Sequence, residues 1–354
     1  MSPSSDTTSA ITVLYHEFLK REPDKAGLAY WCKIANEQGF AAVIKAFSVS
    51  DEYKDKSARE RLDDYCGYAT WELKVIREFI DPNARPQPGF VVDFMGTRIR
   101  TSSLWSSART LDGTVTPVPI PGDFHSEAVE WLGVLKSVQS ARGQYVAMEL
   151  GAGLGPWIIA GGSGARKRGI DNVRLYAVEA DPTHYKLLRQ NLEDNGFCPD
   201  EHILIHAAVG VRADKARWPI IEDSREDWGT RPVEGAKSDY LGRTFDSFLD
   251  IDIVPIIGLV VREPRWDLLH IDVQGHEYHL CAAAIEELSL RVRWLVIGTH
   301  SRLLDGKLIE LLFAAGWELK HEKPSKFRFN AKAETLESMT FVDGVQVWRN
   351  PRLE

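Results

Sequence analysis

The feature that most constrains this chain is a glycine-rich segment, residues 149–157 (ELGAGLGPW), which completes the apolar run YVAMEL. Gly151, Gly153 and Gly155 let the backbone turn sharply and approach a ligand, because glycine carries no Cβ. Pro156 suits the first position of a helix, whose free N–H groups and positive dipole end would point at that ligand. The segment therefore predicts a strand, a binding loop and a helix in succession.

Beyond this segment, apolar runs alternate with helical patterns, which is typical of an α/β fold with a mainly parallel sheet. One helix start is well marked, because Asp181 can cap a helix that begins at Pro182. We predict a Rossmann-like sheet with strands at 145–150, 173–178, 202–208, 267–272 and 292–298, and an antiparallel pair near 317–321 and 341–349.

Acidic residues follow the first two of these strands. Glu149 lies two residues before Gly151 and can engage the ammonium of an amino-acid-like ligand, and Glu179 can accept both ribose hydroxyls of an adenosine. The spacing GxGxG, rather than GxGxxG, favours S-adenosylmethionine over NAD. Glu179 would serve either nucleoside, so a nucleotide-dependent oxidoreductase remains the alternative. We also assign Asp181, beside Glu179, to the cofactor site.

Further ionisable side chains lie at the ends of the later strands. Asp272 ends the strand in DLLHIDVQGHEYH, His276 and Glu277 follow it, and His300 follows the next strand. Because the carboxyl ends of parallel strands meet at one edge, we expect Asp272, His276 and His300 to converge. We favour His300 as a general base, with Asp272 orienting the acceptor or the cofactor's ammonium. A divalent cation held by Asp272 and Glu277 is a competing possibility that we do not favour. His270, within the strand, is interpreted as a hydrogen-bonded core residue.

The N-terminal part of the chain has a different pattern. Residues 1–9 are rich in Ser and Thr and are expected to form a disordered tail. Residues 10–80 carry apolar side chains at three- and four-residue spacing, with a last stripe from Leu62 to Ile80, which predicts a small all-helical module. The Pro-rich segment 81–89 is interpreted as a linker to a domain spanning 90–354.

Composition excludes several classes of function. The chain has 43 basic and 51 acidic residues and a formal net charge of −8, so we do not expect nucleic acid as a partner. The polar N-terminus MSPSSDTTSA lacks the basic and apolar regions of a secretory signal. No apolar stretch approaches the roughly 20 residues that a membrane span requires. We therefore expect a cytoplasmic protein without a membrane span.

Taken together, the motifs ELGAGLGPW, VEAD, HAAVG (206–210), RTFDSFLD (243–250) and DLLHIDVQGHE resemble those of FkbM-type methyltransferases. The resemblance covers roughly residues 90–320. It implies a class I methyltransferase fold and methyl transfer from S-adenosylmethionine to a hydroxyl oxygen, often on a sugar or a glycosylated natural product. It carries over as cofactor contacts Glu149, Gly151, Gly153, Gly155 and Glu179, in a loop completed by Pro156 and Trp157, and as a further site residue Asp272.

The helical module is similar to a short domain of uncharacterised function that recurs in bacterial surface-associated and glycan-processing proteins. The similarity covers about residues 11–55 and rests on Tyr15, Arg21, Pro23, Asp24, Gly27, Tyr30, Trp31, Phe47, Ser50 and Tyr53. The two resemblances together predict a methyltransferase with a sugar or glycan acceptor and a helical accessory module. A non-catalytic scaffold with a methyltransferase fold is the remaining alternative.

Overall fold

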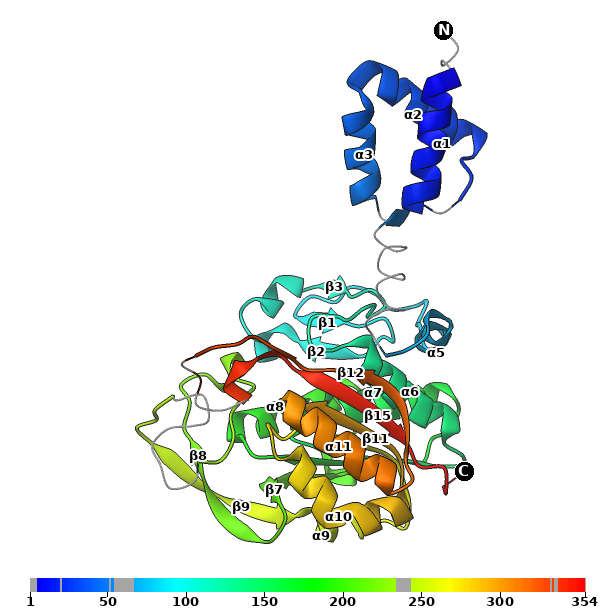
Figure 1. Ribbon diagram of the computed structural model, residues 1–354. Coiled ribbons are helices and arrows are strands. Elements are labelled where there is room, and N and C mark those ends of the chain that lie inside the picture. The colour runs from blue at the N-terminus through cyan, green and yellow to red at the C-terminus, as the bar shows by residue number, and fades with distance from the viewer. Residues whose placement is uncertain are drawn as a thin grey trace. The chain divides into compact units, whose positions relative to one another are not determined.

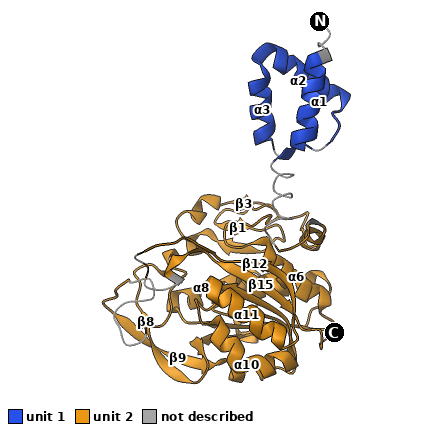
Figure 2. Cartoon of the chain, viewed as in Figure 1, with its two compact units in different colours: residues 1–65 blue, residues 66–354 orange. Residues whose placement is uncertain are grey.

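The computed structural model describes residues 5–19, 21–50, 52–53, 67–233, 243–331, 333 and 337–353. The chain divides into two compact units, residues 1–65 and residues 66–354 (Figure 2). Among the described residues, no helix combines the length and apolarity needed to cross a membrane.

The smaller unit is a cluster of helices, as the apolar spacing predicts. Its described helices are α1 (Ser5–Leu19), α2 (Lys25–Gln38) and α3 (Phe40–Val49). Asp24 caps α2 by accepting a hydrogen bond from the Gly27 N–H at 2.8 Å. The core contains Ile11, Tyr15, Leu19, Cys32, Ala35, Val43 and Phe47. Helix α1 already begins at Ser5, so the expected disordered tail is wrong for residues 5–9, and residues 1–4 lie outside the described part.

The boundary between the units lies earlier in the chain than the sequence pattern predicts. Residues 70–80, expected in the helical module, belong to the larger unit as a 3₁₀ turn (Thr70–Leu73) followed by α5 (Lys74–Arg77). The Glu72 carboxylate accepts a hydrogen bond from Lys136 Nζ at 2.5 Å, and Ile76 is fully buried. A helical spacing shows that one face is buried but not against which partner, which is why the pattern misplaced this segment. The start of the predicted stripe, residues 62–66, lies outside the described residues.

The segment predicted as a linker, 81–89, also lies inside the larger unit. The Asp81 N–H donates to the Phe94 carbonyl at 2.8 Å, and the Asp81 carboxylate accepts from the Asn83 N–H. A hairpin follows this segment: β1 (Phe90–Val92) pairs antiparallel with β2 (Arg98–Arg100), and β3 (Thr114–Val115) adds a parallel strand.

The larger unit is built on a seven-stranded sheet of described residues in the order β12-β15-β11-β10-β4-β5-β6 (Figure 1). Within this sheet β11, β10, β4, β5 and β6 pair in parallel, and β15 runs antiparallel to both of its neighbours. This confirms the predicted α/β class and Rossmann-like sheet. The strands are β4 (Tyr145–Leu150), β5 (Val173–Glu179), β6 (Ile203–His206), β10 (Trp266–Ile271), β11 (Val292–Thr299), β12 (Glu318–Lys323) and β15 (Gly344–Arg349).

Helices cover both faces of this sheet, as the alternation along β4 shows. Val146, Met148 and Leu150 pack into the core cluster shared with α10, whereas the Tyr145 hydroxyl meets Ser137 of α6 at 2.9 Å. Because successive side chains of a strand point to opposite faces, α6 and α10 lie on opposite sides. The helices are α6 (Ala128–Ser140), α7 (Pro156–Lys167), α8 (Pro182–Asp194), α9 (Ile256–Val260), α10 (Glu277–Arg291) and α11 (Arg302–Ala314).

One predicted strand is divided in the structure. The expected strand 202–208 becomes β6 in the main sheet and β7 (Ala208–Gly210), which leaves that sheet to pair with β9 (Phe248–Pro255). β9 also pairs antiparallel with β8 (Asp214–Pro219), so β7, β9 and β8 form a small second sheet that projects from the larger unit (Figure 1). A further short hairpin joins β13 (Lys326–Phe327) to β14 (Thr340–Val342).

Candidate active site

A cavity of about 1930 Å³ lies at the carboxyl ends of β4, β5, β10 and β11. Residues of the β1–α6 segment, the small sheet and the β14–β15 turn complete its walls. Of the residues that the sequence assigns to the site, only Gly155 lies off this surface. The lining includes Glu149, Gly151, Gly153, Pro156, Trp157, Glu179, Asp181, Asp272, His276 and His300.

The glycine loop adopts a backbone that other residues rarely accept. Gly151, Gly153 and Gly155 have φ values of 71°, 54° and 70°, in the left-handed region. At Gly151 an added Cβ would lie 1.9 Å from the Asp272 carbonyl oxygen, so this glycine also permits the close approach of β10 to β4. Gly155 is the N-cap residue of α7, and Pro156 is its first residue, as the sequence predicts.

Glu149 is directed at the start of α7. Its Oε2 atom accepts a hydrogen bond from the Ile158 N–H at 3.0 Å. Complete burial raises the pKa of Glu149 well above its usual range, although the Ile158 and Trp157 N–H groups oppose the rise. Glu149 therefore satisfies free N–H groups at a helix end, while burial disfavours the charged form that would attract an ammonium.

Glu179 is held by the backbone on both carboxylate oxygens. Oε2 accepts from the Gly153 N–H and Oε1 accepts from the Asp181 N–H, each at 2.7 Å. Each oxygen has a second lone pair, so two further hydrogen bonds can be accepted from a ligand in the cavity. Burial raises the pKa of Glu179, and the charge of His184 and both N–H groups oppose that rise.

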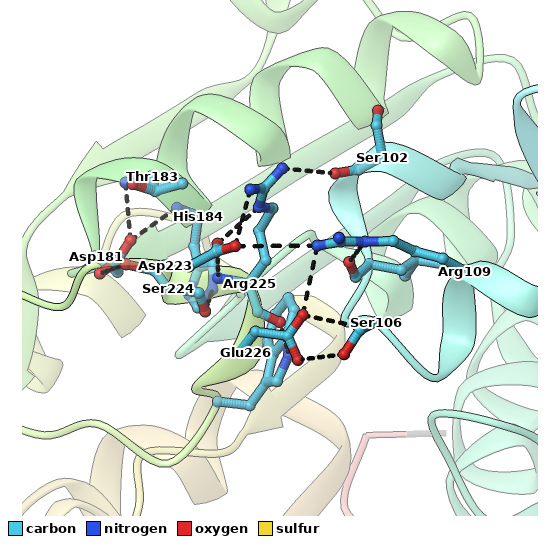
Figure 3. A network of polar contacts seen from close by, with 12 residues as sticks. Ser102, Ser106, Arg109, Asp181, Thr183, His184, Asp223, Ser224, Arg225 and Glu226 are labelled. Carbon is cyan, nitrogen blue, oxygen red and sulfur yellow. Dashed lines mark hydrogen bonds and ion pairs between the residues drawn. The ribbon is translucent and has the colours of Figure 1, made fainter.

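Asp181, in contrast, uses both carboxylate oxygens to accept hydrogen bonds from other residues of the protein. Oδ1 accepts from the N–H groups of Thr183 and His184, which confirms the predicted cap of α8. Oδ2 accepts from the Ser224 hydroxyl at 2.9 Å and lies 3.4 Å from the Trp218 indole nitrogen (Figure 3). Asp181 thus anchors the segment that follows β8 to the start of α8.

The same segment is tied to the opposite wall by charged side chains. Glu226 accepts from the N–H and hydroxyl of Ser106 and from the Arg109 guanidinium, while Arg225 pairs with Asp223 (Figure 3). Trp228 follows directly and reaches over the glycine loop, where a Cβ on Gly153 would lie 3.1 Å from its ring. These contacts close the cavity over the loop.

At the other end, three predicted residues form one cluster. His300 lies between two carboxylates, with Nε2 3.3 Å from Asp272 Oδ1 and Nδ1 3.0 Å from Glu277 Oε1. Glu277 is fully buried, and its Oε1 also accepts from the N–H groups of Val273 and Gly275, which fixes the turn after β10. The Asp272 side chain is 37% exposed and faces the cavity.

This arrangement determines the charge of the cluster. Burial opposes the protonated form of His300, but the Glu277 and Asp272 carboxylates outweigh it and raise the pKa of His300 well above its usual value. Burial acts in the opposite direction on Asp272, and the hydrogen bond and charge of His300 leave the pKa of Asp272 below its usual value. A raised pKa favours the protonated imidazole, whereas a general base must be neutral, so this arrangement does not favour the expected role of His300 as general base.

Two further predictions at this edge of the sheet concern His276 and a divalent cation. His276 is exposed and is the N-cap residue of α10, and it is not part of the cluster. Among the described residues, ligand atoms of Asp272, Glu277 and His300 lie within 4.8 Å of one another, which is compatible with a cation. That set contains the predicted pair Asp272 and Glu277. Both His300 nitrogens already face carboxylates, so a cation bound to this set would compete with the His300 proton for the same carboxylate oxygens.

Two cavity residues were missed or misread in the sequence. His270 is buried, but neither ring nitrogen has a hydrogen-bond partner among the described residues, so its interpretation as a hydrogen-bonded core residue is wrong. Its Nε2 lies 3.6 Å from Oε1 of Glu130, on α6. His270 lies two residues before Asp272 and therefore on the same face of β10, so its position at the site could have been predicted from the sequence. Glu130 lies far from any motif, and the sequence gave no indication that it belongs to the site.

Comparison with known proteins addresses both units. Residues 4–57 match a family model described as a domain of unknown function (DUF4214). A protein of Jannaschia sp. (strain CCS1) named "Putative methyltransferase" is 32% identical over 280 residues, which are 78% of this chain and 98% of the relative. This chain belongs to the methyltransferase family.

Solved methyltransferase structures are more distantly similar. Precorrin-6y C5,15-methyltransferase from Geobacter metallireducens GS-15 is 13% identical, covers 64% of this chain and 89% of its own, and has a TM-score of 0.36. A human methyltransferase 10 domain containing protein is 11% identical over 67% of this chain and 89% of its own, with a TM-score of 0.32. Membership of the methyltransferase family implies S-adenosylmethionine as methyl donor. The glycine loop and the backbone-held Glu179 fit that cofactor.

Proposed function

We propose that this methyltransferase is of the FkbM type and transfers a methyl group from S-adenosylmethionine to a hydroxyl oxygen of a sugar or glycan. The observation that carries this proposal is Asp272, an ionised carboxylate that faces the cavity at the end of β10 and is held in place by His300. A carboxylate at that edge can accept a hydrogen bond from an acceptor hydroxyl.

The adenosine end of the cofactor would lie at the glycine loop, with Glu179 accepting from the ribose hydroxyls. When bound, the cofactor supplies a methyl group already activated by its sulfonium. The protein therefore has mainly to position the acceptor oxygen, which can contribute roughly 7–11 kcal/mol of the barrier. Asp272 orients the hydroxyl and takes its proton, and a positioned base contributes roughly 10²–10⁴-fold. His300 and Glu277 act through Asp272 as positioning residues.

A sugar acceptor is supported by the size and lining of the cavity. At about 1930 Å³ it exceeds the roughly 300–1,000 Å³ typical of small-molecule sites, which leaves space for an acceptor beside the cofactor. Trp105, Phe124 and Trp228 supply apolar ring surfaces, and Glu127 and Asp272 supply acceptors for hydroxyl groups. Flat apolar surface with nearby carboxylates suits a polyhydroxylated ring.

The test is transfer of radiolabelled methyl groups from S-adenosylmethionine to glycan extracts and to defined sugars. We expect alkali-stable label on carbohydrate, because a methyl ether resists alkali whereas a methyl ester does not. Asp272→Asn should lower turnover about 100-fold or more, with cofactor affinity nearly unchanged. Label found only in protein or RNA would contradict the proposal, and cofactor binding without transfer to any acceptor would favour a scaffold. Loss of turnover with a chelator, restored by Mg²⁺, would favour the cation.

A further inference from the structure

His270 is an unusual residue for the interior of a sheet. Its side chain is only 1% exposed, yet both ring nitrogens lack a hydrogen-bond partner among the described residues. An unsatisfied buried polar group costs about 1–3 kcal/mol, so a structure that retains one needs a compensating role for it. The ring lies 5.4 Å from the Trp157 ring and forms part of the cavity surface.

Glu130 approaches the same point from α6. Its Oε2 accepts from the Glu127 N–H at 3.0 Å, which fixes the carboxylate at the start of the helix. Its Oε1 lies 3.6 Å from His270 Nε2, beyond hydrogen-bond distance, and Glu130 also lines the cavity. A hydrogen-bond donor and a carboxylate therefore stand side by side at the cavity wall.

This pair is next to the glycine loop. On the paired strands β10 and β4, His270 lies directly opposite Glu149, and Trp157 is the second residue of α7. Sequence reasoning assigns the cofactor's ammonium to Glu149. In the structure Glu149 is buried and its Oε2 atom accepts from the Ile158 N–H at the start of α7, so we look for another partner for the ammonium.

We propose that His270 and Glu130 form the subsite for the amino-acid end of S-adenosylmethionine. The His270 ring donates a hydrogen bond to the α-carboxylate, and the Glu130 carboxylate accepts from the α-ammonium. One donor and one anion match the two charges of a zwitterion, and each partner uses the atom that the protein leaves open. The inference rests on the proposed use of S-adenosylmethionine as cofactor.

The experiment is isothermal titration of the full chain with three ligands that share the adenosine, two with the amino-acid end and one without it. S-adenosylmethionine and S-adenosylhomocysteine carry the amino-acid group, and 5′-methylthioadenosine lacks it. Glu130→Gln removes the charge but keeps an oxygen for the Glu127 N–H. His270→Phe keeps the ring against Trp157 and removes both nitrogens. Glu179→Gln is the matched control, because it alters the adenosine side.

We expect each subsite variant to weaken binding of both amino-acid ligands about 10- to 100-fold, the usual effect of losing a charge-assisted hydrogen bond. Binding of 5′-methylthioadenosine should change by no more than about twofold, which also shows that the variants are folded. Glu179→Gln should weaken all three ligands alike. Equal affinities of wild type and subsite variants for S-adenosylmethionine would overturn the subsite, as would parallel losses for all three ligands. A wild-type protein that binds none of the three would instead overturn the proposed function.

Discussion

The two ends of the cavity are built in different ways. At the end where we propose that adenosine binds, called the adenosine end, the glycine loop and Glu179 are organised by backbone contacts: the Gly153 and Asp181 N–H groups hold both Glu179 oxygens. At the other end, Asp272 and His300 come from separate strands, and Glu130 and His270 come from a helix and a strand.

The difference lies in what remains open for a ligand. The adenosine end is preorganised by backbone N–H groups, which leave each Glu179 oxygen a second lone pair for a ligand. The far end retains unsatisfied atoms in the cavity wall, because both nitrogens of His270 lack a hydrogen-bond partner among the described residues. Unmet polar groups in a cavity wall are stabilised when a ligand binds, so this end is where we expect specific recognition.

The strongest test of the adenosine end is Gly151→Ala. The left-handed backbone costs about 1–2 kcal/mol and the contact with the Asp272 carbonyl adds roughly 1–3 kcal/mol, so we expect about 2–5 kcal/mol of lost stability and no measurable cofactor binding. Gly143→Ala is the control, since φ there is 72° and no heavy atom lies within 4 Å of an added Cβ. Denaturant unfolding should show the two variants differing by the contact energy. Equal losses of unfolding free energy in the two variants would mean that β10 moves to accommodate the added methyl group.

A second comparison separates binding from structure at the same end. Glu179→Gln should weaken S-adenosylmethionine binding by about 1.5–3 kcal/mol, because it removes charge-assisted acceptors, with a smaller effect on unfolding. Asp181→Ala should instead lower the free energy of unfolding by about 1–2 kcal/mol through loss of the α8 cap, with nearly unchanged affinity. Calorimetry measures the affinity of each variant for S-adenosylmethionine, and denaturant unfolding measures its free energy of unfolding. A large loss of affinity in Asp181→Ala would return Asp181 to the cofactor site, where the sequence placed it.

The smallest expected effect tests the charge of His300 through pH. Its pKa is raised above the ordinary 6.5, so the stability it contributes, about 1.5 kcal/mol, is fully present below pH 6.5 and is lost as pH rises through the folded-state value. The melting temperature of His300→Gln should therefore approach that of wild type in alkali.

His321 provides a control of opposite sign. Burial and the Lys136 charge lower the pKa of His321 to about 4, so its contribution is present above pH 6.5 and is lost as pH falls towards 4. A difference between wild type and His300→Gln that grows with rising pH would show that His300 is neutral and restore it as a candidate base.

The sequence alone determined the elements whose signals are local. The strand-loop-helix around Gly151, Gly153 and Gly155, the Asp181 cap and the acid at Glu179 were all predicted, because positive φ values, capping and strand ends are encoded within a few residues. The convergence of Asp272 and His300 was also predictable, since parallel strands end at one edge.

Only the tertiary structure decided the electrostatics and the distant contacts. The charge of His300 depends on Glu277 and Asp272 facing opposite sides of one ring, and the role of Glu149 depends on α7 folding back over its oxygen. The place of residues 70–80 was settled by contacts with α6, which also brings Glu130 to His270 from 140 positions earlier in the chain. A spacing pattern records that a residue is buried, whereas the partner that sets its charge and its hydrogen bonds comes from another element.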